Sequence, residues 1–502
     1  MNNFINALKD DANYVYTENG AITYASTMDS LLDLFSLGGA YRSRSNEDCI
    51  FLFKKALEEN EAYALKCLFY LRDIREGQGE RRFFRTVIKW LANNHTDAIK
   101  RNLKYIPEFG RWDDLYEFIN TPLEKDALDI MYHQLSLDVQ SKTPSLLGKW
   151  LKSENTSSKI SRKIANKTRE YFGMTHREYR KTLSILRERI RVIERLMSAS
   201  RWDEIEFDKI PSKAGMIYRN AFAKHDIDRM RLGAEKSYKE FAEDKDTKVN
   251  ADALYPYDVV RKALDFSENW GYYYGKKSTD LNDTERLMIN KYWDNLKDVF
   301  NGYVFNGICV CDVSGSMYGM PMAVAISIAM YCAEHNSGPF ANHFFTFSHV
   351  PTFMTIEGID FVDKVNRISE SEWGMNTNVE AVFDKMLNIA LENDLDQKDI
   401  PETIIIISDM EFDHCVIANR SKVKETLFES IEKTWKEAGY KMPRLTFWNC
   451  DARQDNIPMR KEGHVNFVSG CSQNIFEQVM RGLSAVDLMM DKLNSKRYNC
   501  IH

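Results

Sequence analysis

The sequence changes character near residue 302, and this change constrains the fold more strongly than any other feature. Residues 301–350 contain neither lysine nor arginine, and from there onward short apolar runs alternate with amphipathic segments. This alternation predicts an α/β domain with a mostly parallel, doubly wound sheet, in which ligands bind beyond the carboxyl ends of the strands. We expect strands at 308–311, 342–347, 351–356, 403–408, 444–448 and 464–468, and helices at 322–333, 378–392, 421–438 and 473–485.

The chain before residue 302 has helical rather than strand-like periodicity. Residues 62–74 place apolar side chains three and four positions apart, and a second segment of this kind covers residues 82–91. Residues 235–250 are polar and predict a loop or linker. We therefore expect two domains, an all-α body of stacked helices over residues 1–300 and the α/β domain over residues 301–502.

The composition is that of a folded chain that does not enter a membrane. Hydrophobic residues make up 44% of the 502 residues and charged residues 28%, the ordinary range of globular proteins. The longest nearly apolar run, 322–333, is shorter than the about 20 residues that a membrane-spanning helix needs. The nine cysteines contain no CxxC pair, which suits a reducing compartment and predicts a cytoplasmic location.

A strongly basic segment lies at residues 142–195, where 15 side chains are basic and five are acidic. Its cations recur around Tyr171, Phe172 and Tyr179, and such a mixture can neutralise phosphates and stack on unpaired bases. The alternative is that the cations form solvated helix faces and the aromatic side chains fill the core. Together with a smaller arginine cluster near residue 80, the residues expected to contact RNA are Lys159, Arg162, Lys163, Lys167, Arg169, Arg177, Arg180, Lys181, Arg81 and Arg82.

A group of oxygen-bearing side chains follows the first predicted strand of the α/β domain. The loop Asp312-Val313-Ser314-Gly315-Ser316 carries a carboxylate and two hydroxyls at alternate positions. Thr377 lies in a later loop, and Asp409 follows the strand 403–408. Hard oxygen ligands of this kind suit Mg²⁺ or Mn²⁺. The alternative is a loop of helix-capping residues that binds no metal.

These motifs resemble the metal-ion-dependent adhesion site of von Willebrand factor A domains, and the resemblance covers about residues 302–490. It implies that Ser314 and Ser316 bind the metal directly and that Thr377 binds it directly or through water. It also implies that Asp312 and Asp409 hold coordinated waters. The remaining coordination position would accept an acidic oxygen from a partner.

Further stretches resemble an uncharacterised family that pairs a helical region with a C-terminal A domain, and this match spans nearly the whole chain. The stretches that carry it are Phe69–Arg75, Gly79–Arg81, Ile106–Asp114, Gly374–Thr377, Ser408–Asp413 and Phe447–Asn449.

A more distant resemblance in domain order links the chain to the Ro autoantigen (TROVE) proteins. In that family a ring of HEAT-like helical repeats joins an A domain and binds structured or misfolded noncoding RNA. The resemblance implies a HEAT-like body in this chain, but it assigns no RNA contact to a particular residue.

Sequence motifs of common enzymes are absent. The chain has no GxxxxGK[ST] phosphate loop, no HExxH motif and no cysteine pair with zinc spacing. Cys471 could be a nucleophile but has no assigned base, so a buried thiol in a turn is the better interpretation. Glu411 and Asp413 could extend the metal site or cap a turn. We therefore expect a protein without catalytic residues.

Two functions of different class remain open. The first is a non-catalytic RNA-binding protein whose basic helical body holds the RNA and whose A-like domain holds Mg²⁺. The second is a protein-interaction module in which the metal site clamps an acidic side chain of a partner. Added salt should weaken RNA binding, whereas a chelator should weaken the metal-dependent protein interaction. A metal-dependent nuclease fits poorly, because one hydroxyl-rich site does not resemble a two-metal phosphodiester site.

Overall fold

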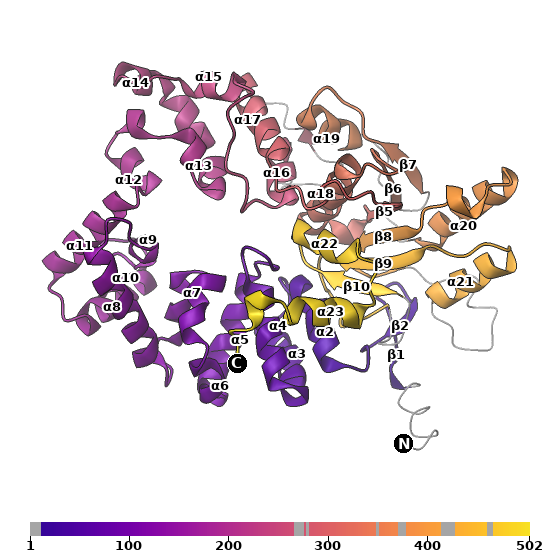
Figure 1. The fold of residues 1–502 in the computed structure, drawn as a ribbon, viewed down its shortest axis with the longest axis horizontal. Coiled ribbons are helices and arrows are strands. Elements are labelled where there is room, and N and C mark those ends of the chain that lie inside the picture. Colours follow the sequence, from indigo (N-terminus) through magenta and orange to yellow (C-terminus); the bar gives the residue numbers. More distant parts are fainter. Residues whose placement is uncertain are drawn as a thin grey trace. The chain divides into compact units, whose positions relative to one another are not determined.

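The computed structural model describes residues 12–265, 276–277, 281–347, 351–369, 378–412, 427–458 and 465–502. The chain forms two compact units (Figure 1). Unit 1 consists of Met1–Cys67 and Leu254–Ser495, and unit 2 consists of Leu68–Ala253 and Lys496–His502. This division differs from the predicted boundary at residue 300, because α2 (Ser30–Leu37) packs on β10 (Asn466–Ser469) and α16 (Pro256–Ala263) packs on α18 (Met320–His335), so the segments before and after unit 2 in the sequence both belong to unit 1.

Unit 1 contains the six-stranded sheet that the sequence predicts. Its strands lie in the order β10-β9-β8-β5-β6-β7, and all neighbours are parallel except β6 and β7. Every residue of β5 and β8 is buried, which explains their continuous apolar sequences. The strands are β5 (Gly307–Asp312), β6 (His343–Phe347), β7 (Thr352–Thr355), β8 (Thr403–Ser408), β9 (Arg444–Asn449) and β10 (Asn466–Ser469).

Helices pack around this sheet. The almost wholly buried helix α18 (Met320–His335) contacts β5, β6 and β8. The others are α19 (Phe361–Ser369), α20 (Glu380–Glu392), α21 (Leu427–Glu437), α22 (Phe476–Val479) and α23 (Ala485–Leu493). The single helix predicted at 473–485 is wrong: α22 and α23 replace it, because Gly482 between them has a positive φ of 64° that ends the helical path.

The sequence segments that flank unit 2 complete unit 1. The antiparallel strands β1 (Tyr14–Tyr16) and β2 (Ile22–Tyr24) form a hairpin, and Tyr24 exchanges two backbone hydrogen bonds with Ile457. Helix α2 packs on β10, and α16 packs on α18. The helices of these segments are α2 (Ser30–Leu37), α3 (Asn46–Glu59), α4 (Glu61–Arg72, whose last residues enter unit 2), α16 (Pro256–Ala263) and α17 (Asp283–Asp294); β3 (Leu264–Asp265) and β4 (Lys276–Lys277) form a short ladder.

Unit 2 is a helical body, as predicted, and its described residues contain no strand. The predicted linker at 235–250 is wrong in part, because Ser237 caps a short helix that buries Tyr238 and Phe241. A HEAT-like repeat stays a prediction. The helices are α5 (Arg81–Asn94), α6 (Thr96–Lys100), α7 (Ile106–Phe109), α8 (Glu124–Gln140), α9 (Leu147–Trp150), α10 (Lys159–Tyr171), α11 (His176–Arg189), α12 (Ile193–Ser198), α13 (Ser212–Lys224), α14 (Asp226–Arg231) and α15 (Tyr238–Glu243).

A buried ion pair fixes the first helices of unit 2. Arg72 and Asp114 are 2% and 0% exposed, and the Arg72 guanidinium binds Asp114 Oδ2 through Nε at 2.9 Å and Nη2 at 2.7 Å. Arg85 Nε binds the other carboxylate oxygen at 2.6 Å. Asp114 is therefore fully paired, as a buried carboxylate must be.

The segment Lys496–His502 returns to unit 2 after the whole α/β part of the chain. Arg497 donates to both carboxylate oxygens of the buried Asp73, and the Tyr498 hydroxyl donates to Asp73 Oδ2 at 3.0 Å. The Tyr498 ring stacks on Phe109 with centroids 5.6 Å apart. Ile501 is buried as well, so this segment is part of the core of unit 2.

Two predictions from the composition concern membrane-spanning helices and cysteines. In the ranges described above, no helix combines the length and apolar character that crossing a bilayer requires. The described cysteines form no disulfide bonds with one another, and all except Cys500 are buried.

Candidate metal centre and basic helical face

The candidate metal centre lies where two neighbouring parallel strands of unit 1 end. The register pairs Cys311 of β5 with Ile407 of β8, so Asp312 and Ser408 come next, side by side. The chain forms β6 and β7 on one side of β5 and continues with β8 on its other side. This reversal makes the crevice between the ends of β5 and β8 the topological switch point, where ligands bind in open α/β sheets.

Asp312 is wholly buried at this edge. Its Oδ1 accepts a hydrogen bond from Ser314 N at 2.9 Å, and its Oδ2 accepts one from the Ser408 hydroxyl at 2.6 Å. Burial, and after it the nearby carboxyl of Asp409, raise the pKa of Asp312 to about 7, although these hydrogen bonds lower it.

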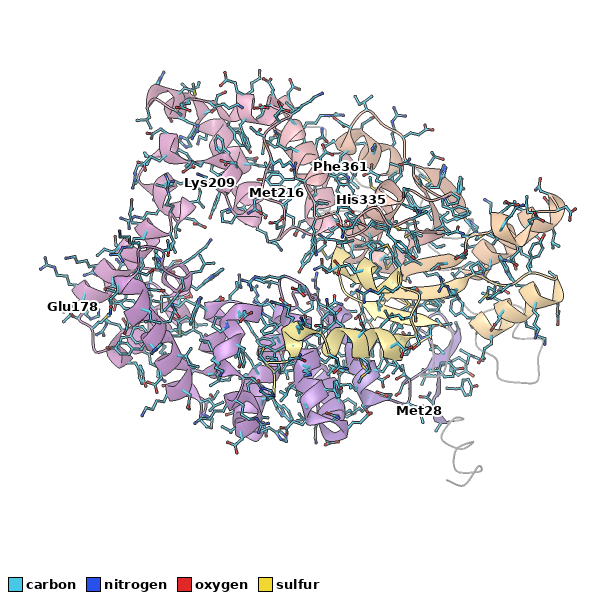
Figure 2. The ribbon with its side chains drawn as sticks, viewed as in Figure 1. Met28, Glu178, Lys209, Met216, His335 and Phe361 are labelled. Carbon is cyan, nitrogen blue, oxygen red and sulfur yellow. The ribbon has the colours of Figure 1, made fainter. Side chains whose placement is uncertain are left out.

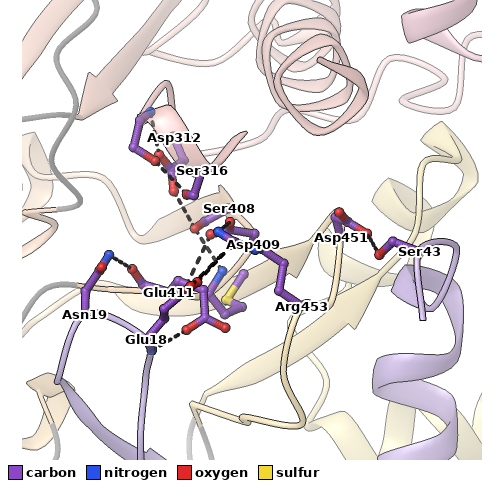
Figure 3. A network of polar contacts seen from close by, with 12 residues as sticks. Glu18, Asn19, Ser43, Asp312, Ser316, Ser408, Asp409, Glu411, Asp451 and Arg453 are labelled. Atoms are coloured by element: carbon purple, nitrogen blue, oxygen red, sulfur yellow. Dashed lines mark hydrogen bonds and ion pairs between the residues drawn. The ribbon is translucent and has the colours of Figure 1, made fainter. Parts of the chain in front are cut away.

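Asp409 is the second buried carboxyl of the centre, with 1% exposure (Figure 3). Burial raises its pKa, and a hydrogen bond from the Ser316 hydroxyl opposes that shift. Its Oδ1 accepts a bond from Glu411 N at 3.3 Å, whereas its Oδ2 has no hydrogen-bond partner in the part of the chain that the structure describes. Arg453 Nη1 lies 3.8 Å from that oxygen, beyond hydrogen-bond distance.

The two serine hydroxyls lie between these carboxyls, with Ser314 Oγ and Ser316 Oγ 3.1 Å apart. The structure thus brings together Asp312, Ser314, Ser316 and Asp409, four of the five predicted metal ligands. Thr377 lies outside the described residues. In the described part of the chain, no three histidine, cysteine or acidic side chains lie together in a way that could hold a metal ion. A metal bound at this centre would therefore need the serine hydroxyls as ligands as well.

This donor set fits a divalent cation. Two carboxyls held close together in a buried place repel each other when both are ionised, and a cation between them offsets that repulsion. Asp409 Oδ2 adds a buried oxygen that accepts no hydrogen bond from the described residues. Carboxylate and hydroxyl oxygens are ligands that Mg²⁺ and Mn²⁺ accept.

Around the centre, Ser408 was not identified from the sequence, whereas Glu411, Asp413 and Cys471 were considered there. Ser408 bonds Asp312, and its position at the end of an apolar strand was the available signal. Glu411 caps the hairpin and does not extend the metal centre, because its carboxylate accepts from Glu18 N at 2.6 Å and from Asn456 Nδ2 at 3.0 Å. Asp413 lies outside the described residues. Cys471 is buried, with 1% exposure.

The predicted RNA-contacting cations divide into two groups in unit 2. Lys167 Nζ pairs with Glu124 at 2.6 Å, and Arg169 Nε pairs with Glu154 at 2.9 Å, so both serve contacts within the protein. Arg81 and Arg82 are exposed at the start of α5. The exposed cations of α10 and α11 are Lys159, Arg162, Lys163, Arg177, Arg180 and Lys181.

These six cations, called here the basic face, recur at the same spacing on both helices. They occupy positions i, i+3 and i+4, first from Lys159 on α10 and then from Arg177 on α11, which places each trio on one side of its helix. None forms an ion pair with a described carboxylate, and Arg162 and Arg180 donate to backbone carbonyls. Glu178, next to Arg177 in the first turn of α11, points away from the neighbouring helices (Figure 2).

The aromatic residues of the basic segment have mostly structural positions. Phe172 and Tyr179 are 5% and 1% exposed, and the Tyr179 hydroxyl donates to the Lys152 carbonyl at 2.9 Å. Tyr171 is 37% exposed and donates to Asp129 Oδ1 at 2.5 Å. Of the two possibilities that the sequence left open, core filling holds for Phe172 and Tyr179, and stacking on bases does not.

Comparison with known proteins gives relatives without an assigned activity. Residues 306–498 match a domain of unknown function, DUF7788. Across 93% of the chain and 85% of its relative, the sequence is 30% identical to "Uncharacterized protein L728" of Acanthamoeba polyphaga mimivirus. The crystal structure of the Deinococcus radiodurans RO (RSR) protein aligns with 94% of this chain and 100% of its own, at 13% identity and a TM-score of 0.41.

A second family model matches the helical region and covers more of the chain than the first. A second domain of unknown function, DUF2828, matches residues 17–170 and 133–300, which together are more than half of the chain. The expected resemblance to an uncharacterised family with a helical and a C-terminal part agrees with these matches, whereas the von Willebrand A identity of the C-terminal part stays a prediction. The chain belongs to the DUF2828 family.

Proposed function

We propose that this protein binds RNA without catalysing a reaction and that the basic face of α10 and α11 is the contact surface. The observation that carries the proposal is that six cations, in two matched trios, are exposed and have no carboxylate partner among the described residues. A helix face that is only solvated usually carries charges of both signs, whereas each of these trios carries positive charges alone. Structured or misfolded noncoding RNA is the class that the Ro resemblance implies.

Phosphate contacts of this kind have a measurable signature. If each of the six cations neutralises one phosphate of single-stranded RNA, the logarithm of affinity falls with the logarithm of salt concentration at a slope of about −4. The side chains already paired within the protein, Lys167 and Arg169, contribute little to that slope.

The companion proposal is that unit 1 is a von Willebrand A-like domain that holds Mg²⁺ or Mn²⁺ through Asp312, Ser314, Ser316, Thr377 and Asp409. The strand order supports it, since counting strands from β5 gives 3-2-1-4-5-6, the order of a doubly wound sheet. The cation would supply an open coordination position for an acidic oxygen, while Ser408 and the Ser314 amide hold Asp312 in place.

The protein-interaction function is the second candidate, because one specific observation favours it. The buried, unpartnered Asp409 Oδ2 belongs to a centre suited to a cation, and a bound cation could clamp an acidic side chain of a partner protein. A chelator would abolish that interaction, whereas it would leave phosphate contacts of the basic face intact.

The first experiment measures the ratio of absorbance at 260 and 280 nm on natively purified protein, followed by sequencing of any extracted nucleic acid. A high ratio with discrete RNA species supports RNA binding. A protein-only spectrum, together with no capture of a labelled structured RNA at low salt, contradicts it and leaves the metal-dependent interaction.

A pair of triple variants then tests the surface. Arg177, Arg180 and Lys181 are changed to Glu in one variant, and Lys224, Arg231 and Lys245 in the control. Both sets are exposed residues of unit 2 and change the net charge equally. We expect loss of RNA binding only in the first variant, and equal loss in both would show that overall charge, not this face, attracts RNA.

A further inference from the structure

Arg453 is a cationic side chain next to the candidate metal centre, and the metal motif does not include it. It follows β9, and its guanidinium lies between two carboxyls of unit 1 (Figure 3). Nη1 is 3.8 Å from Asp409 Oδ2, and Nη2 is 3.1 Å from Glu18 Oε2. Arg453 therefore faces a carboxylate oxygen of the centre that has no hydrogen-bond partner among the described residues.

Hydrogen bonds to the segment 40–44 fix the backbone around Arg453. The Arg453 carbonyl accepts from Arg44 Nη1 at 2.6 Å, and Ala452 N donates to the Ala40 carbonyl at 3.0 Å. Asp451 accepts a bond from the Ser43 hydroxyl at 2.6 Å. The side chain itself is 39% exposed, so its guanidinium is not enclosed by the core.

Glu18 is held beside the centre by the hairpin of β1 and β2. Its backbone N–H donates to Glu411 Oε2 at 2.6 Å, and Asn19 Nδ2 donates to the Glu411 carbonyl at 2.6 Å. The Thr17 hydroxyl donates to the Phe412 carbonyl at 2.7 Å. The hairpin tip is therefore bound to the residues directly after Asp409, and the Glu18 carboxylate, 48% exposed, stays within reach of Arg453.

We propose that Arg453 is a built-in competitor for the divalent cation at Asp409 and that Glu18 weakens this competition by drawing the guanidinium away. The inference rests on the proposed metal site. A guanidinium near Asp409 offsets part of the buried negative charge and repels an incoming cation. Because Arg453 is closer to Glu18 than to Asp409, the hairpin sets how strongly the arginine opposes the metal.

The test measures Mn²⁺ binding to the full chain by electron paramagnetic resonance and Mg²⁺ binding by calorimetry. Arg453→Gln should tighten binding by about fivefold or more, because it removes one positive charge near the cation. Arg453→Lys keeps the charge and should stay near the wild-type affinity. The control is Arg481→Gln, an exposed arginine of unit 1 that pairs with Asp491 and makes the same change in net charge.

Glu18→Gln gives a prediction of opposite sign. It should weaken metal binding, because Arg453 then turns fully toward Asp409. Loss of the Glu18 charge would also weaken cation binding if Glu18 attracted the cation directly. The double variant Glu18→Gln with Arg453→Gln separates this direct effect from an effect through Arg453. If Glu18 acts through Arg453, the effect of Glu18→Gln should shrink when Arg453 is already Gln. An equal effect in both backgrounds would contradict the role given to Glu18.

The failures of the inference and of the metal site are distinguishable. Metal binding that Arg453→Gln leaves unchanged or weakens overturns the competition and keeps the site. Absence of binding in the wild type and in every variant, with circular dichroism spectra like that of the folded wild type, overturns the site itself. Binding that appears only in Arg453→Gln supports both, since the arginine then excludes the cation completely.

Discussion

Gly110 shows how one residue decides the packing of the helical unit. It lies between α7 and the residues that carry Asp114, at the point where Arg72 and Asp114 meet. A Cβ atom built on Gly110 would lie 2.3 Å from Asp114 Oδ2 and 2.8 Å from Arg72 Nε. No side chain fits there, so the glycine is needed for the close approach of backbone to a buried ion pair.

Gly110→Ala should therefore lower the free energy of unfolding by about 3 kcal/mol, because it separates a buried pair and leaves charges without partners. Denaturant unfolding followed by circular dichroism measures the change. Gly173→Ala is the control: its φ is +64° but a Cβ meets nothing within 4 Å, so about 1 kcal/mol of backbone strain is expected. Equal losses in the two variants would contradict the packing argument.

At the scale of elements, the sequence predicts best where a run of residues lies in one kind of environment. Strands β5 and β8 are apolar throughout because both faces are buried, and α18 is almost wholly buried, so all three were found near their true bounds. Helix α15 was missed, because its six residues are too few for periodicity to emerge against polar neighbours. The long helix expected at 473–485 failed because one positive φ, at Gly482, is not visible in an amphipathic pattern.

The C-terminal segment is an element whose role depends on tertiary contacts alone. Arg497→Ala should destabilise unit 2 by about 3 kcal/mol, because it leaves the carboxylate of Asp73, which is 0% exposed, without its cation. Hydrogen exchange measured by mass spectrometry should show faster exchange in α4 and α7, whose residues contact this segment. The exposed neighbour Lys496→Ala should change neither stability nor exchange. Unchanged exchange in Arg497→Ala would mean that the segment does not hold these helices.

At the scale of the whole molecule, a local sequence motif predicts its own candidate metal ligands. It does not predict the residues from distant parts of the sequence that lie next to them. That Asp312, Ser314, Ser316 and Asp409 lie close together could be predicted, because parallel strands bring their carboxyl ends to one edge; their role as metal ligands stays a prediction. The positions of Arg453 and Glu18 could not be predicted, since these residues come from a loop after β9 and a hairpin at the far end of the sequence. The basic segment was visible as a charge excess, but its division into paired and free cations depends on where Glu124 and Glu154 lie.

The two proposed activities belong to different compact units and share no side chain, so they should separate experimentally. Asp312→Ala should abolish Mg²⁺ binding and the rise in thermal midpoint that Mg²⁺ produces, because the carboxylate that anchors the loop is gone. RNA affinity should stay within about twofold of the wild type, since changes at independent sites add without coupling. Calorimetry and RNA filter binding on the same preparation measure both. If RNA affinity collapses while the variant remains folded, the metal in unit 1 supports RNA binding, and the assignment of one role to each unit is wrong.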